Sequence, residues 1–165
     1  MTLWELNRLS ASAFVTALGH VFEHSPWVAE RASAAAPFAS LEALHAAMSE
    51  VEMQASRDEQ LDLLRAHPDL GTRAKMTAAS EGEQSGAGLD RMGRDDYDRL
   101  QRLNTAYRTK FGFPFLYAVK GSTVAQILAA LDARLAADWD QEFVEGLRQA
   151  SRIARFRLET LFTDT

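Results

Sequence analysis

The sequence predicts an all-α fold of about six to eight helices, and three observations lead to this prediction. Apolar residues recur at spacings of three and four along most of the chain, which is the period of an amphipathic helix. Serine and threonine residues that favour helix starts precede several of these stretches. No pair of segments shows the alternation and turn residues of a β-hairpin. The chain has 165 residues and can bury one core, so we expect a single domain over residues 1–165.

Composition excludes several classes of protein. A net charge of −5 without a basic run argues against binding to nucleic acid or to an anionic membrane. The absence of cysteine excludes disulfides, thiolate catalysis and cysteine-based zinc sites. No apolar run approaches the roughly 20 residues of a membrane span, and the first residues lack the pattern of a signal peptide. We therefore expect a soluble, cytoplasmic protein.

About five helical segments are expected before residue 67. They begin near Thr2, Ser12, Trp27, Ser40 and Ser56. Thr2 and Ser56 are each followed three residues later by a glutamate, which is the pattern of a capping box. The second segment is expected to continue as far as Ser25-Pro26, because its apolar residues keep helical spacing up to Phe22.

Three longer helices are expected in the second half of the chain. Their ranges are 95–110, 122–137 and 140–162, starting at Asp95 or Asp96, Ser122 and Asp140. The aromatic segment 111–119 contains Gly and Pro and breaks the helical period, so we expect it to run extended against the core. Asn104 falls within an apolar helix face, and a buried amide needs hydrogen bonds. It either braces a neighbouring loop or contacts a ligand, and bracing is the favoured interpretation.

The side chains suited to chemistry concentrate between residues 67 and 89. His67 precedes Pro68, whose ring disfavours helical backbone at the residue before it, so the imidazole should lie on a turn at a helix end. Asp69 is expected to pair locally with Arg65 or Arg73. Ser80 and Glu83 have capping-box spacing, so Glu83 either closes a helix start or acts in a pocket.

The residues after Glu83 favour the pocket interpretation. Glycines within a helix are costly, at about 1 kcal/mol each, so Gly86 and Gly88 suggest the close approach of a ligand or of another backbone. A histidine and a glutamate in such a pocket suit acid–base chemistry on a polar small molecule.

Arg157 differs from the other arginines of the last helix. Its neighbours one turn away are Ile153, Ala154 and Leu161, so it projects toward the apolar side. Either the side chain snorkels along the edge of that face, or its guanidinium is aimed into a pocket at a carboxylate or carbonyl. In the second case, we expect replacement by methionine to leave stability almost unchanged and to reduce activity.

Four sequence motifs, in a fixed order, carry a resemblance to a known family. The resemblance runs from about Leu6 to about Leu161. The motifs are His67-Pro68-Asp69-Leu70; Ser80-x-x-Glu83-Gln84-Ser85-x-Ala87-Gly88-Leu89; Leu103-Asn104-x-x-Tyr107 with Phe111-Gly112-Phe113-Pro114-Phe115; and Ile153-Ala154-x-x-Arg157-Leu158. In this order and spacing the chain resembles the OHCU decarboxylases. These enzymes act on 2-oxo-4-hydroxy-4-carboxy-5-ureidoimidazoline in the last step from urate to (S)-allantoin. The short connector 72–79 and Gly82 depart from the family pattern and could alter the shape of the pocket.

The resemblance implies an all-α, cofactor-free carboxy-lyase that is commonly a homodimer and whose partner is a small ureidoimidazoline. It implies catalytic roles for His67, as the acid–base residue, and for Glu83, which could hold the imidazole or accept from the ureido N–H. The substrate-binding residues that it implies are Pro68, Ser80, Gln84, Phe115, Leu116, Tyr117, Ala118, Val119 and Arg157. Pro68 and residues 115–119 would contribute mainly backbone contacts.

Two alternatives remain from other classes. A non-catalytic helical module could bind a ureide without turning it over. A metal-dependent hydrolase is disfavoured, because catalytic zinc usually takes about three protein ligands and the stretch 67–89 holds one histidine. His20 and His24 have a metal-ligand spacing but lie away from the apolar residues of their segment, so a solvated face is expected there. We therefore expect no metal site.

Overall fold

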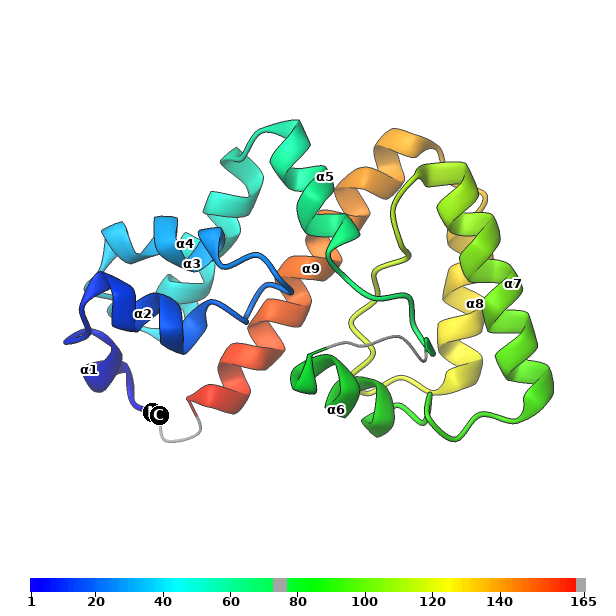
Figure 1. The fold of residues 1–165 in the computed structure, drawn as a ribbon, viewed down its shortest axis with the longest axis horizontal. Helices are drawn as coiled ribbons and strands as arrows, with labels where there is room; N and C mark the ends of the chain where they lie inside the picture. Colours follow the sequence, from blue (N-terminus) through cyan, green and yellow to red (C-terminus); the bar gives the residue numbers. More distant parts are fainter. Residues whose placement is uncertain (73–76, 163–165) are drawn as a thin grey trace. The chain divides into compact units, whose positions relative to one another are not determined.

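The computed structural model describes residues 1–72 and 77–162, and within these ranges it confirms the all-α fold. The described residues form nine α-helices and one short 3-10 turn, with no strand among them (Figure 1). They group into two compact units. The first unit comprises Met1–Ala66 with Ala150–Thr165, and the second comprises His67–Gln149. Within the described ranges, no helix is both long and apolar enough to cross a bilayer.

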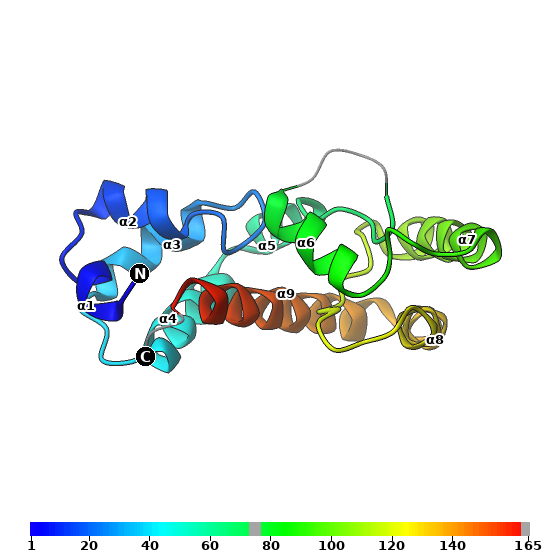
Figure 2. The ribbon, with the colours of Figure 1, turned by 90° about the horizontal axis from the view of Figure 1, so that it is seen from below.

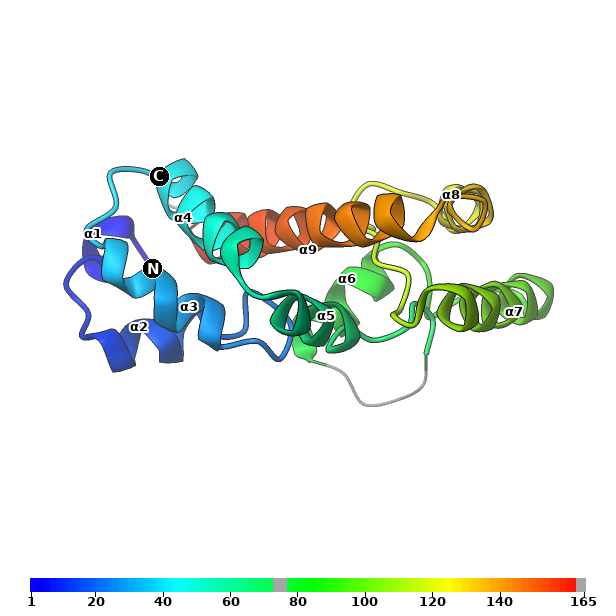
Figure 3. The ribbon, with the colours of Figure 1, turned by 90° about the horizontal axis from the view of Figure 1, so that it is seen from above.

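The first unit is built mainly from five helices near the start of the chain. They are α1 (Leu3–Leu6), α2 (Ala11–Leu18), α3 (Trp27–Ala32, continued by the 3-10 turn Ser33–Ala35), α4 (Leu41–Gln54) and α5 (Arg57–Arg65). Helix α3 packs against both α2 and α4 (Figures 2 and 3). The predicted caps Thr2, Ser40 and Ser56 are confirmed, each accepting a hydrogen bond from a backbone N–H in the first turn of its helix.

Helix α2 is shorter than predicted, ending at Leu18 instead of continuing to Ser25. Its C-cap is Gly19, where an added Cβ would lie 2.6 Å from the Val15 carbonyl oxygen and 3.3 Å from the Pro26 Cβ. The chain therefore turns where only glycine fits. Val21 and Phe22 are still fully buried, so the apolar spacing marked core residues correctly but not the helix end.

The second unit contains α6 (Ala78–Gly86), α7 (Arg94–Phe111), α8 (Val124–Arg134) and the first part of α9 (Trp139–Leu161). Helices α7 and α8 pack side by side (Figures 1 and 2). The predicted starts of α7, α8 and α9 are wrong by one to three residues. The N-cap residues are Gly93 for α7 and Thr123 for α8, and the Asp138 carboxylate accepts from the N–H of Gln141 at the start of α9.

The segment between α7 and α8 lies in an aromatic cluster. Helix α7 ends at Phe111, and its C-cap Gly112 has a φ of 78°, a left-handed conformation that favours glycine. The Tyr107 ring lies edge-on to Phe113 and Phe115, with centroids 6.1 and 5.5 Å apart. Phe115 and Tyr117 stack at 5.8 Å, and rings two residues apart share a face only when the backbone is extended. The prediction of an extended segment is therefore confirmed over residues 115–117, whereas Phe111, also in the predicted range, is the last residue of α7.

Candidate active site

His67 opens the second unit, directly after the end of α5. Its side chain is buried, with 6% of the residue exposed. The turn that follows is held from two helices of the same unit. Asn104 in α7 donates from Nδ2 to the Leu70 carbonyl at 2.9 Å, and the Gly71 N–H donates to Gln84 Oε1 in α6 at 2.8 Å. The prediction that Asn104 braces a loop is confirmed, and that loop carries the candidate acid–base residue.

Asp69 on this turn does not take the expected partner Arg65. Its carboxylate accepts from Arg108 Nη2 at 2.9 Å, and both side chains are partly exposed. The other expected partner, Arg73, lies outside the described residues. A partly exposed pair of this kind contributes little stability, so its main effect is to tie the turn to α7.

Helix α6 carries three of the predicted polar residues, and its start settles one alternative. Thr77 caps the helix by accepting from the Ser80 N–H, so Ser80 lies within the first turn and is not the N-cap. The explanation of Glu83 as the partner in a capping box at Ser80 is therefore wrong. Ser80 and Gln84 are one turn apart and both buried, while Glu83 beside them is half-buried.

The glycines of α6 do not make room for another backbone. A Cβ placed on Gly82 or Gly86 would meet no described atom within 4 Å outside the helix. Of the two reasons predicted for Gly86, only the approach of a ligand remains, and it stays a prediction. Gly88 follows the helix with a φ of 81°, which glycine adopts without strain.

Two residues that sequence reasoning missed hold the segment 115–119. Arg134 in α8 donates from Nη1 to the Leu116 carbonyl at 2.6 Å. Gln149 in α9 accepts from the Ala118 N–H at 2.9 Å. Nothing in the sequence pointed to either, because backbone acceptors and donors leave no residue-type signal.

Arg157 belongs to the first unit and is buried. Its Nη2 lies 2.9 Å from the Glu23 carboxylate, and its Nη1 donates to the carbonyls of His20 and Val21 at 3.3 and 3.4 Å. The guanidinium is thus buried against a carboxylate and carbonyl groups of the first unit and does not snorkel, while its predicted contact with a ligand stays a prediction. Sequence reasoning missed Glu23, whose carboxylate is fully buried. Burial, followed by the charge of Arg157, lowers the pKa of His20.

Metal-ligating groups do not converge in the part of the chain that the structure describes. Within residues 1–72 and 77–162, no three histidine, aspartate or glutamate side chains are placed to share an ion. His20 and His24 are both exposed, as predicted. A cavity of about 900 Å³ lies in the second unit. Its lining includes Gln84, which is a predicted site residue, and also Gly71 and Glu81.

All predicted site residues except Arg157 lie in the second unit. A buried histidine follows a helix end, its turn is hydrogen-bonded to a polar helix face, and an extended segment belongs to the same unit. The family model for OHCU decarboxylase matches residues 7–159. The chain belongs to the OHCU decarboxylase family. Members of this family are carboxy-lyases.

Similar proteins agree with this assignment. The chain is 48% identical to the 2-oxo-4-hydroxy-4-carboxy-5-ureidoimidazoline decarboxylase of Haloferax volcanii, over 99% of this chain and 97% of that protein. Its structure is similar to a crystal structure of (S)-allantoin synthase, with a TM-score of 0.81, 32% identity, and coverage of 98% of this chain and 54% of the other. It is also similar to OHCU decarboxylase crystallised in the presence of (S)-allantoin, with a TM-score of 0.74, 25% identity, and coverage of 87% and 96%.

Proposed function

We propose that this protein decarboxylates 2-oxo-4-hydroxy-4-carboxy-5-ureidoimidazoline to (S)-allantoin, with His67 as the acid–base residue. Family membership across residues 7–159 carries the reaction. The burial of His67 at the head of a braced turn supports its role, because an imidazole held in a fixed position suits proton transfer to a defined atom.

The chemistry of the substrate explains why acid–base groups suffice. The departing carboxylate sits on a carbon next to a C=N bond that is conjugated with the ureido and ring carbonyl groups. When CO2 leaves, the electron pair of the broken C–C bond moves into this conjugated system. The protein then has to orient the carboxylate, stabilise the resulting anion with fixed donors, and deliver a proton to one face.

The polar residues of the second unit suit these tasks. Ser80 and Gln84 lie one turn apart on the buried face of α6 and supply hydroxyl and amide groups. Glu83, released from a capping role, either holds the imidazole or accepts from the ureido N–H. Pro68 and residues 115–119 supply backbone contacts.

The test generates the unstable substrate enzymatically from urate and follows chiral allantoin by circular dichroism. Wild-type protein should form (S)-allantoin, and His67→Asn should lose roughly 10²–10⁴-fold in kcat. His45→Asn is the matched control, because His45 is also partly buried and its Nε2 lies 2.8 Å from the Ser151 carbonyl oxygen in the first unit. Binding of (S)-allantoin without any turnover by the wild type would instead indicate a ureide-binding module.

We also propose that the chain acts as one domain, as a homodimer in the cytoplasm, without metal or organic cofactor. The family model spans nearly the whole chain, which supports the single domain. Light scattering of the purified protein tests the dimer. A monomeric mass at the concentration of the activity assay would contradict it.

A further inference from the structure

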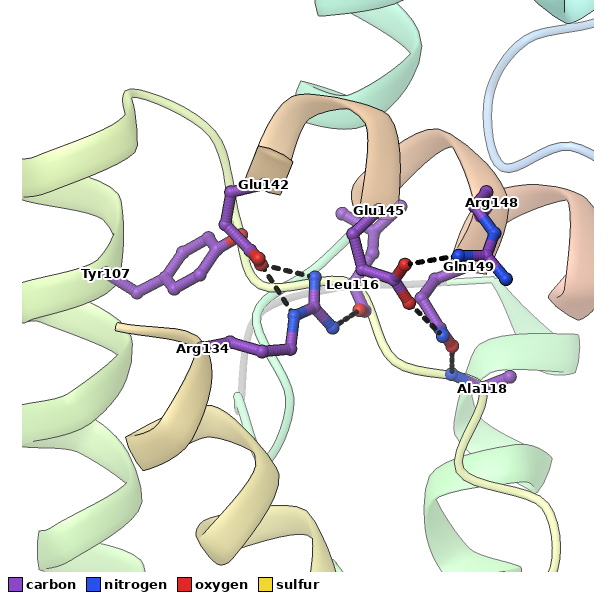
Figure 4. A network of polar contacts seen from close by, with 8 residues as sticks. All are labelled: Tyr107, Leu116, Ala118, Arg134, Glu142, Glu145, Arg148 and Gln149. Carbon is purple, nitrogen blue, oxygen red and sulfur yellow. Dashed lines mark hydrogen bonds and ion pairs between the residues drawn. The ribbon is translucent and has the colours of Figure 1, made fainter. Parts of the chain in front are cut away.

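One face of α9 meets the extended segment 115–119 within the second unit. Glu142, Glu145 and Gln149 are spaced by three and four residues, so they share a helix face. Figure 4 shows this face directed at the segment, with Arg134 of α8 between Glu142 and the backbone. Three helices thus contribute side chains to one polar network, because Tyr107 of α7 also joins it.

Arg134 connects the network to the backbone at Leu116. Its Nε donates to Glu142 Oε1 at 2.6 Å, and its Nη1 donates to the Leu116 carbonyl at 2.6 Å. The guanidinium also lies over the Phe115 ring, 4.5 Å from the centroid. Glu142 is almost fully buried and accepts a further hydrogen bond from the Tyr107 hydroxyl at 2.5 Å. The planar fork is therefore fixed on two sides, which a flexible ammonium group could not reproduce.

Gln149 makes the second connection, two residues further along. Its Oε1 accepts from the Ala118 N–H at 2.9 Å, and its Nε2 donates to Glu145 Oε1 at 2.8 Å. Glu145 also accepts from the exposed Arg148. The amide is thereby oriented with its oxygen toward the segment (Figure 4).

The two connections use one edge of the segment and leave Tyr117 on the opposite edge, where the Val119 carbonyl accepts from the Ser122 N–H at 2.9 Å. In extended backbone, the N–H and C=O of one residue point to one edge and those of the next residue point to the opposite edge. Leu116 and Ala118 are two residues apart, so Arg134 and Gln149 occupy the same edge. Tyr117 lies between them, and among the described residues neither its N–H nor its carbonyl has a hydrogen-bond partner. A donor and an acceptor on one residue match the –CO–NH– edge of a cyclic ureide.

We propose that Arg134 and Gln149 are positioning residues, which fix residues 116–118 so that the Tyr117 backbone N–H and carbonyl meet the ureide edge of the substrate. This inference rests on the proposed function. Neither residue touches the substrate itself. Both residues act through the backbone. Replacing either side chain should therefore weaken the binding of substrate and product, and this effect should exceed any loss of stability.

The experiment compares Gln149→Met and Arg134→Lys with Lys110→Met. Lys110 is a matched control, because its Nζ donates to the carbonyls of Leu135 and Ala137 in the same unit without contacting the segment. For each variant we would measure the melting temperature, KM and kcat with substrate generated from urate, and the Kd of (S)-allantoin by calorimetry. Gln149→Met and Arg134→Lys should raise KM and Kd about five- to tenfold, corresponding to the loss of one well-placed hydrogen bond. Lys110→Met should lower the melting temperature alone.

A reciprocal swap tests whether the hydrogen bond, and not the side-chain volume, is responsible. In Glu145→Gln with Gln149→Glu, position 149 keeps an acceptor for the Ala118 N–H and position 145 donates back to it. This double variant should restore KM and Kd to within about twofold of wild type. The inference is overturned if the swap does not restore binding, or if Gln149→Met raises KM and Kd no more than Lys110→Met.

The outcomes separate this inference from the proposed function. If Arg134→Lys fails to fold, Gln149→Met and the swap decide the matter. If wild-type protein binds (S)-allantoin but forms none, the proposed function fails, and the Kd values still decide the positioning role. If wild-type protein does not bind (S)-allantoin, both fail.

Discussion

Arg157 and Glu23 form a buried ion pair in the first unit, with 4% and 0% of their side chains exposed. Removing both charges from water is costly, and their mutual attraction offsets that cost only while both are present. From sequence alone, replacement of Arg157 by methionine was expected to leave stability almost unchanged. The pair reverses this expectation, because a methionine at position 157 leaves the Glu23 carboxylate buried without its guanidinium.

We predict that Arg157→Met lowers the free energy of unfolding by about 3–5 kcal/mol, the usual cost of leaving one partner of a buried pair. Arg152→Met on the exposed face of the same helix is the control and should change it by less than about 0.5 kcal/mol. The double variant Glu23→Gln with Arg157→Met should recover much of the loss in urea unfolding. If Arg157→Met and Arg152→Met change the free energy of unfolding equally, the Arg157–Glu23 pair contributes nothing to stability.

Glu52 in α4 is a second buried carboxyl, with 1% of the residue exposed. Neither of its carboxylate oxygens has a hydrogen-bond partner among the described residues. Burial raises the pKa of Glu52 to about 8 from an ordinary value of 4.5. The folded protein therefore holds this proton over a pH range in which the unfolded chain releases it.

This difference predicts the direction of a pH effect on stability. Between about pH 4.5 and 8 the folded state binds more protons than the unfolded state, so the contribution of Glu52 to stability falls as the pH rises. Glu52→Gln should remove that decline, and its advantage over wild type should grow by roughly a few kcal/mol across the window. Glu50→Gln, at an exposed carboxylate of the same helix, should keep the wild-type slope. Melting curves at several pH values measure both, and parallel slopes for Glu52→Gln and wild type would refute the prediction.

At the scale of a helix, α6 shows where sequence reasoning reaches its limit. Thr77 and Ser80 are both acceptable N-caps, and only Ser80 is followed by a glutamate at the capping-box spacing. Caps differ by about 1 kcal/mol or less, so packing decides between them and sequence cannot. The structure starts the helix at Ala78 after Thr77, which frees Glu83 from the cap.

Although the predicted starts of α7, α8 and α9 are displaced by one to three residues, the caps Thr2, Ser40 and Ser56 were predicted correctly, because a cap depends on local residue type. The partners of the site residues were not predicted. Arg134, for example, contacts the Leu116 carbonyl only after α8 has packed beside the segment 115–119. A backbone carbonyl is present at every position and so gives no signal in the sequence.

For α6 itself, we predict that Gly82→Ala raises the free energy of unfolding by about 1 kcal/mol, because alanine is the better helix former. The added Cβ meets no described atom within 4 Å outside the helix, and the residue lies on the exposed side, away from buried Ser80 and Gln84. The kcat/KM should stay at the wild-type value. A lower kcat/KM in a more stable protein would mean that substrate passes over this face, as the glycines first suggested.

At the scale of the whole molecule, we predict that activity does not depend on a bound metal. The conjugated system of the substrate accepts the electron pair left by CO2, so the reaction has no need of a Lewis acid. The kcat should be unchanged after exhaustive chelation, and elemental analysis should find less than stoichiometric metal. Loss of activity that returns on addition of Zn²⁺ would favour the hydrolase alternative.

The division of the chain between the two units has a consequence for its folding during synthesis on the ribosome. Residues 67–149 are contiguous, so the second unit leaves the exit tunnel with all of its own packing partners. The first unit needs Ala150–Thr165 as well, and His20 is 137 residues upstream of Arg157, to which its carbonyl is bonded. The Glu23 carboxylate therefore cannot form its buried ion pair until Arg157 has been translated. The first unit should therefore complete its folding after the second unit.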